Sequence, residues 1–343
     1  MEKTKNLKIR VIALTAALAV MLSVRASAFE KKRLLLPMGS AIGISLKCSG
    51  LMVAGFLCVG EGEKARSPAQ EAGIRPGDII TRIGEEKLES AAELKAILIE
   101  KGMNDAELHI TRGKKTLTVF VTPQEGEDNR PELGIWLREG ITGIGTVTYI
   151  DPTTGAFGSL GHSVSDPQTG IILPISGGVV TGVSITSAVR GENGFPGALI
   201  GNYDYSSILG KITVNSPEGV FGFFSEIPMF EDNRLMEAAD REEVRVGDAI
   251  ILSTVCGEAP VSYNVKILRI YPEGDDSGRD MLIEICDDRL NGITGGIVQG
   301  MSGSPIIQNG RLVGAVTHVL LSEPKKGYAI SIEKMLKSAD LSR

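Results

Sequence analysis

The sequence predicts a mainly β fold, with two six-stranded barrels from Leu133 to the C-terminus and a small α+β domain before them. Short apolar runs separated by Gly, Pro, Asn or Asp turns fill the chain after Leu133, and no helix pattern appears there before Ile332–Ser338. The 42 glycines exceed ordinary usage and suit many tight turns. A length of 343 residues accommodates two domains.

The smaller domain is predicted over residues 34–123. Apolar runs at Ile42–Leu46 and Leu51–Ala54 flank a Ser-Gly turn, and a second turn leads into the buried strand Ile79–Ile80. Ser90–Lys101 reads as a helix, because Ser90 and Glu93 form a capping box before apolar residues at helical spacing. Two alternating runs, 107–110 and 116–121, complete a hairpin.

The stretch SPAQEAGIRPGDIITRIG, which begins at Ser67, resembles the most recognisable segment of PDZ domains. These domains bind extended peptides by adding a strand to a sheet edge, and loop amides receive the terminal carboxylate. The resemblance implies that Ile42, Gly43 and Ile44 form this loop and bind peptide. Taken alone, these three residues suit an ordinary strand with a turn glycine. The polar segment 124–132 ends in Pro131 and is predicted to be a linker to the domain at 133–343.

The N-terminus predicts export. Four basic residues precede the apolar run Val11–Val24, and Ala26-Ser27-Ala28 has the form of a signal-peptidase site. The run is shorter than the roughly 20 residues that span a bilayer, which favours a signal peptide over an anchor for residues 1–28. Arg25 stands between the run and the cleavage site, so retention of the segment as a membrane anchor is the alternative.

The strongest chemical signal is Gly300-Met301-Ser302-Gly303-Ser304-Pro305. It resembles the nucleophile loop of chymotrypsin-like serine proteases, which predicts a chymotrypsin-like double β-barrel. Glycines on both sides of Ser302 let the loop turn tightly, so that the hydroxyl is exposed and the amides of Gly300 and Ser302 point at one oxyanion. Ser304 is followed by a rigid proline and is the weaker candidate for the nucleophile.

Three histidines compete for the role of general base. His109 falls in an alternating strand of the smaller domain, and His318 ends the strand after the nucleophile loop, where a specificity role is expected. His162 follows a hairpin-like segment and precedes Ser302, in the order that the chymotrypsin-like fold uses. His162 is therefore the predicted base.

The segments GSLGHSVSD and TGGIVQGMSGSPIIQNGRLVGAVTHV, behind a PDZ-like domain and an export signal, resemble the stage IV sporulation protein B serine peptidases of endospore-forming bacteria. The resemblance implies a His-Asp-Ser triad whose acid is Asp287, with Asp288 and Asp204 as alternatives; Asp287 and Asp288 also suit a plain turn after a strand. It further implies secretion from the forespore into the intermembrane space. The expected substrate is a membrane-bound sporulation regulator whose cleavage triggers activation of a late sigma factor.

Composition excludes several other classes. Net charge is −6 and no basic block lies beside aromatic residues, so nucleic acid is not an expected partner. The four cysteines show neither CxxC spacing nor pairing with histidine, so neither a metal nor another cofactor is predicted. Cys48 and Cys58 suit either a disulfide or small buried residues.

The favoured hypothesis is a serine endopeptidase. Met301 stands where ordinary chymotrypsin-like proteases carry the aspartate that receives a liberated N-terminus, so regulation through the PDZ domain or by self-cleavage is expected instead. The main rival is a non-catalytic scaffold that only binds peptides, and a membrane-anchored adaptor is a third hypothesis.

Overall fold

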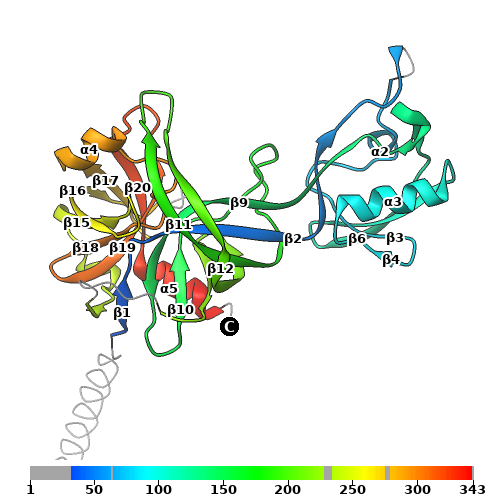
Figure 1. Cartoon of the computed structure of the whole chain (residues 1–343). Coiled ribbons are helices and arrows are strands. Elements are labelled where there is room, and N and C mark those ends of the chain that lie inside the picture. The colour runs from blue at the N-terminus through cyan, green and yellow to red at the C-terminus, as the bar shows by residue number, and fades with distance from the viewer. Residues whose placement is uncertain (1–31, 63–64, 228–233, 275–278, 342–343) are drawn as a thin grey trace, which may run out of the picture. The chain divides into compact units, whose positions relative to one another are not determined.

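The structure, a computed structural model, describes residues 32–62, 65–227, 234–274 and 279–341. It is mainly β, and its strands form two closed barrels, with a smaller α+β domain inserted in the first (Figure 1). The predicted fold class is confirmed. The predicted export segment, residues 1–28, lies outside the described residues. Within the described part of the chain, no helix is long and apolar enough to cross a membrane.

The first barrel consists of six strands. In spatial order they are β9 (Ile135–Ile150), β10 (Ala156–Ser159), β13 (Gly219–Phe224), β12 (Ala198–Ser216), β11 (Ile175–Val189) and β2 (Ala41–Phe56). The ring closes because β9 also pairs with β2. Alternate side chains point inward to a core that includes Ile44, Val147, Phe157 and Val180. The short strands β1 (Leu34–Pro37) and β14 (Met236–Glu237) extend the sheet beyond β9.

The second barrel is a closed ring of six strands. They are β15 (Gly247–Ser253), β16 (Val261–Ile270), β17 (Met281–Ile285), β20 (Lys326–Ser331), β19 (Arg311–Val319) and β18 (Pro305–Gln308). The core of this barrel extends to Val183 and Leu199 of the first barrel, so apolar packing joins the two. The short helices α4 (Asp288–Thr294), α5 (Ile332–Leu341) and η3 (Arg241–Glu243) lie outside the ring of strands.

The smaller domain has its own apolar core. Its elements are α2 (Pro68–Glu71), β3 (Ile79–Ile83), β4 (Glu86–Lys87), α3 (Ala91–Lys101), β5 (Ala106–Arg112) and β6 (Lys115–Val121). Helix α3 begins where predicted, and the Ser90–Glu93 capping box is present. The buried carboxylate of Asp78, from the PDZ-like motif, accepts hydrogen bonds from the Arg75 amide and from the Arg112 guanidinium. Both its oxygens are thereby satisfied.

The domain boundaries differ from the predicted ones. Strand β2 is continuous from Ala41 to Phe56: its first half belongs to the first barrel, and its second half reaches the core of the smaller domain through Leu51 and Val53. The return strand β9 likewise contributes Leu137 to that core. The predicted linker at 124–132 folds into β7 (Gln124–Glu125), η2 (Glu127–Asn129) and β8 (Pro131–Glu132). The PDZ-like domain is thus an insertion on two long strands.

Candidate active site

The loop that carries Ser302 has the backbone shape that its glycines predict. Gly300 and Gly303 have φ angles of 100° and 97°, which L-residues rarely adopt. A Cβ on Gly303 would lie 1.9 Å from the carbonyl oxygen of Thr146, so only glycine fits against the first barrel there. The turn leaves the Ser302 side chain half-buried in the wall of a cavity.

Two amides of this loop are free to bind an oxyanion. Among the described residues, neither the Gly300 amide nor the Ser302 amide has an acceptor, whereas the intervening Met301 amide donates to the Val298 carbonyl at 3.1 Å. Gly300 and Ser302 both line the cavity. Two unpaired amides on either side of one residue beside a nucleophile are the arrangement that stabilises the tetrahedral intermediate of acyl transfer.

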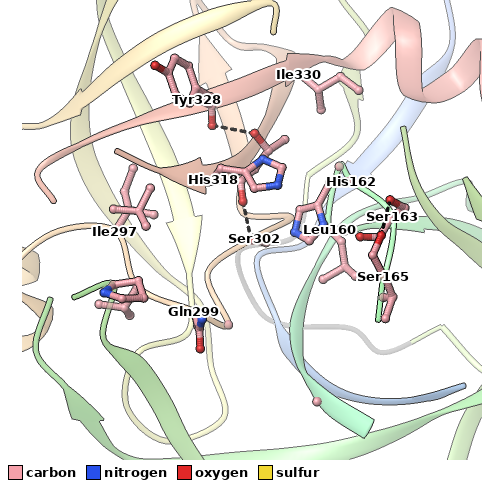
Figure 2. A pocket seen from close by; sticks show the side chains of 18 of the residues that line it. Leu160, His162, Ser163, Ser165, Ile297, Gln299, Ser302, His318, Tyr328 and Ile330 are labelled. Carbon is pink, nitrogen blue, oxygen red and sulfur yellow. Dashed lines mark hydrogen bonds between the residues drawn. The ribbon is translucent and has the colours of Figure 1, made fainter. Parts of the chain in front are cut away.

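The hydroxyl of Ser302 donates to the main-chain carbonyl of Thr317 at 2.5 Å (Figure 2). Thr317 belongs to β19 and lines the same cavity. Its own hydroxyl donates to the Tyr328 carbonyl at 3.0 Å. No hydrogen bond joins Ser302 to His162 within the described residues, so the hydroxyl must rotate away from Thr317 before His162 can accept its proton.

His162 enters the same cavity from the first barrel. Leu160 and Gly161, just before it, have φ angles of 67° and 69°, and this tight turn projects the ring towards the second barrel. The His162 ring lies 4.5 Å, centroid to centroid, from the ring of His318 (Figure 2). Its Nδ1 lies 2.8 Å from the carbonyl oxygen of Ser163, an acceptor that fixes the proton on Nδ1 and leaves Nε2 free.

Burial sets the charge of both histidines. It lowers the pKa of His162 below the usual value, although the hydrogen bond to the Ser163 carbonyl acts in the opposite direction. It also lowers the pKa of His318 to about 4, with further contributions from His162 and the Arg279 guanidinium. Both rings are therefore neutral near pH 7, which is the state that a general base requires.

The cavity between the barrels has a volume of about 1240 Å³. Its walls include apolar side chains from both barrels, among them Ile144, Leu199, Ile297 and Val319, with Glu218, Arg279 and Lys334 as the charged residues. A cavity of this kind, with a few convergent polar groups, is typical of a substrate site.

A family model described as "SpoIVB peptidase S55" matches residues 129–336, more than half of the chain. The chain belongs to the SpoIVB peptidase S55 family. A second model, described as a PDZ domain, matches residues 61–111. The predicted family and its combination with a PDZ domain are confirmed, and this membership makes the chain a serine peptidase.

Shorter similarities point to another group of serine proteases. The protein named "Serine protease HTRA2, mitochondrial" from Bos taurus is 39% identical over 61 residues, which are 18% of this chain and 13% of that protein. Its counterpart from Drosophila persimilis is 37% identical over 59 residues, 17% and 14% of the two chains. The S55 chain thus spans about an eighth of the length of these relatives.

Asp287 lies apart from the other two predicted triad residues. It is the N-cap of α4, where its carboxylate accepts hydrogen bonds from the Arg289 amide at 2.9 Å and pairs with the Arg289 guanidinium at 2.8 Å. The Asn264 amide donates to it at 3.2 Å. The Arg289 guanidinium holds the pKa of this carboxyl well below its usual range. Asp287 does not line the cavity, and no contact with His162 is present among the described residues.

The other candidates also lie away from the nucleophile. Asp288 begins α4 and is exposed, and Asp204 is exposed on β12, where it binds Ser206. The hydroxyl of Ser304 is buried and donates to Ser253 at 3.0 Å, so it does not face the cavity. His109 lies in β5 of the PDZ domain, beside Thr118. His318, by contrast, lines the same cavity as Ser302, and its ring lies against that of His162. The specificity role expected for His318 stays a prediction.

The predicted peptide-binding loop, Ile42, Gly43 and Ile44, is wrong in this structure. These residues lie inside β2 and pair with β9 on one side and with β11 on the other, and Ile42 and Ile44 are buried in the barrel core. No incoming strand can therefore join them. Sequence reasoning missed Ile135–Arg138, which among the described strands pairs only with β2 and so has one open edge. The pattern Leu133-Gly134-Ile135, apolar-Gly-apolar like the predicted loop, was the available signal.

Four cysteines are free in the described structure. Cys48 is buried, whereas Cys58, Cys256 and Cys286 are exposed. Burial raises the pKa of the Cys48 thiol to about 11, which keeps the thiol protonated and poorly reactive. Within the described residues, no cluster of His, Cys, Asp or Glu could hold a metal ion.

Proposed function

We propose that this S55 peptidase is an endopeptidase that uses Ser302 as nucleophile and His162 as general base. The observation that carries the proposal is the meeting of both side chains in one cavity, next to two unpaired amides.

A bound peptide completes the arrangement. An extended substrate beside β19 would present an amide to the Thr317 carbonyl, which now accepts from Ser302. The displaced hydroxyl would then turn to Nε2 of His162. The Ser302 oxygen attacks the scissile carbonyl as its proton passes to His162, and the amides of Gly300 and Ser302 bind the oxyanion. His162 returns the proton to the leaving amine. Water then attacks the acyl-enzyme while His162 accepts its proton, and the acid product leaves as Ser302 takes that proton back.

The third member of the triad remains a proposal from the family resemblance. Asp287 is bound by Arg289 here, and the Ser163 carbonyl is the acceptor that orients His162. A role for Asp287 therefore requires that its carboxylate leave Arg289 when substrate binds. A carboxylate would stabilise the imidazolium more strongly than a neutral carbonyl does.

The proposed biological role follows from the family resemblance. It begins with export across the membrane, after which residues 1–28 are either removed or retained as a membrane anchor. There it would cleave a membrane-bound sporulation regulator and also itself. The PDZ domain would contribute peptide recognition at the open edge Ile135–Arg138, because strand addition requires an unpaired sheet edge.

The test compares purified wild type with Ser302→Ala and Ser304→Ala, measuring digestion of a protein substrate and the N-termini of each product. Ser302→Ala should lose nearly all activity and keep its original N-terminus, whereas Ser304→Ala should remain substantially active. Equal loss in both variants, or full activity in Ser302→Ala, would reject Ser302. A wild type that binds peptides but cleaves none would favour the scaffold alternative.

A further inference from the structure

Thr146, in the barrel half of β9, binds the loop that carries Ser302. Its side chain is fully buried, and its hydroxyl donates to the carbonyl of Gly300 at 2.7 Å. Its main-chain amide donates to the carbonyl of Ser302 at 3.0 Å. Thr146 thus makes two hydrogen bonds across the boundary between the barrels.

The same residue also binds the segment that leads to His162. The carbonyl of Thr146 accepts from the Ser159 hydroxyl at 2.7 Å and from the Leu160 amide at 3.4 Å. Ser159, like Thr146, is fully buried. One residue of the first barrel is therefore bonded to the loops that hold both proposed catalytic side chains.

The two carbonyls that Thr146 binds lie next to the amides that are proposed to bind the oxyanion. The Gly300 carbonyl belongs to the peptide plane between the two amides proposed to bind the oxyanion, and the Ser302 carbonyl belongs to the plane just after them. Both planes adjoin the planes that carry these two amides, so holding them restricts the backbone angles of residues 300–302, which set the directions of the amides. Among the described residues, the Thr146 hydroxyl is the one side-chain group that donates to a carbonyl between Gln299 and Ser302.

We propose that Thr146 is a positioning residue, which holds the oxyanion-binding amides of Gly300 and Ser302 in place through its hydroxyl. The inference rests on the proposed roles of Ser302 and of those amides. Oxyanion stabilisation depends on donors that are oriented before the reaction begins, so a loop that is free to rotate would lose rate without losing affinity.

Thr146→Val is the test variant, because valine has nearly the shape of threonine but no hydroxyl. Thr146→Ser restores the hydroxyl, and Thr142→Val is the matched control. Thr142 lies on the same strand, and its hydroxyl contacts Ser45 at 3.1 Å on the surface instead of the loop. Each protein is treated with a fluorophosphonate, and the maximal labelling rate and the half-saturating concentration are measured separately, together with the urea midpoint.

The Thr146→Val variant should label about 10- to 100-fold more slowly at saturation, a smaller loss than the 10²–10³ typical of deleting an oxyanion donor. Its half-saturating concentration should not change, and Thr146→Ser and Thr142→Val should both label at nearly the wild-type rate. Should the valine variant fail to fold, Thr146→Ala removes the same hydroxyl and should show the same loss.

Two results would overturn the inference. Wild-type labelling of Thr146→Val with a lower urea midpoint would mean that the hydroxyl only stabilises the fold. A loss that Thr146→Ser does not rescue would mean that the hydroxyl is not the group responsible. Absence of labelling at Ser302 in the wild type is a different failure, because it would reject the proposed function together with this inference.

Discussion

Gly303 shows how one residue constrains the nucleophile loop. A Cβ there would lie 1.9 Å from the Thr146 carbonyl oxygen and 2.6 Å from the Leu160 amide nitrogen, and both are main-chain atoms that side-chain rotation cannot move. The residue also has φ of 97°. The loop and the first barrel can therefore approach this closely only at glycine.

Gly303→Ala should abolish fluorophosphonate labelling and lower the free energy of unfolding by several kcal/mol, on the order expected when strain and a core clash combine. Gly310→Ala is the control, since Gly310 has φ of 74° but nothing within 4 Å of its Cβ position. It should cost about 1 kcal/mol for the backbone alone and leave labelling intact. Equal effects of the two substitutions would contradict the account of Gly303.

The pH dependence of labelling should report the protonation of His162. Burial lowers its pKa, so the neutral base persists below the usual histidine value of about 6.5, and the rate should fall only as pH drops below that value. Protonation of Asp287 cannot cause this fall in the labelling rate, because the pKa of Asp287 is held far lower. The His318→Gln variant should show the same fall in labelling rate, since the pKa of His318 is about 4. A midpoint above 7 would contradict the buried, neutral His162.

Asp287→Asn tests the remaining triad assignment. Asparagine is also a good N-cap, so α4 should persist and the protein should fold. If Asp287 orients His162 during the reaction, labelling should fall by orders of magnitude, as expected for a wrong tautomer, while Asp288→Asn remains active. Full labelling of both variants would leave the Ser163 carbonyl as the orienting group.

The candidate site was predictable at this scale only in part. Ser302 and His162 carry local signals, a Gly-rich turn and a Gly-His segment, and the structure brings both to one cavity. The Thr317 and Ser163 carbonyls carry none, because any residue supplies a carbonyl. Their part depends on the backbone path, which a sequence pattern does not specify.

Among the elements, β2 and β9 depart most from the sequence prediction. Short strands were predicted after Leu133, whereas β9 runs without a break for 16 residues, from Ile135 to Ile150. Gly140 and Gly143 lie inside this strand. A Cβ on Gly140 would lie 2.2 Å from the Leu46 carbonyl oxygen, so this glycine permits close approach of β2 within a continuous strand.

Gly140→Ala and Gly143→Ala therefore form a matched pair. Gly140→Ala should force β2 and β9 apart and destabilise the protein by about 1–3 kcal/mol. Gly143 has no atom within 4 Å of its Cβ position, so its substitution should be neutral or slightly stabilising. Urea unfolding of the two variants measures the difference. Equal destabilisation in both variants would contradict this explanation, because it would show that the cost does not come from the contact between the new Cβ and β2.

For the whole molecule, the sequence predicted two barrels and the order of the catalytic residues, because turn spacing and motif order are local or linear properties. It did not predict that the PDZ domain is inserted on strands of the first barrel. Ile42–Ile44 was assigned to that domain because the sequence of one strand does not show which distant strands it pairs with. In the structure these partners are β9 and β11. The motif Ser67–Gly84 nevertheless located the domain, since its turn and buried Asp78 are encoded locally.

We propose that the two barrels together make a working serine nucleophile at Ser302. The most direct measurement is fluorophosphonate labelling of the full chain, followed by mass spectrometry of the labelled peptide. Wild type should carry the label on Ser302, Ser302→Ala and His162→Ala should remain unlabelled, and Ser304→Ala should label normally. A folded wild type that takes no label, or takes it at Ser304, would contradict the account.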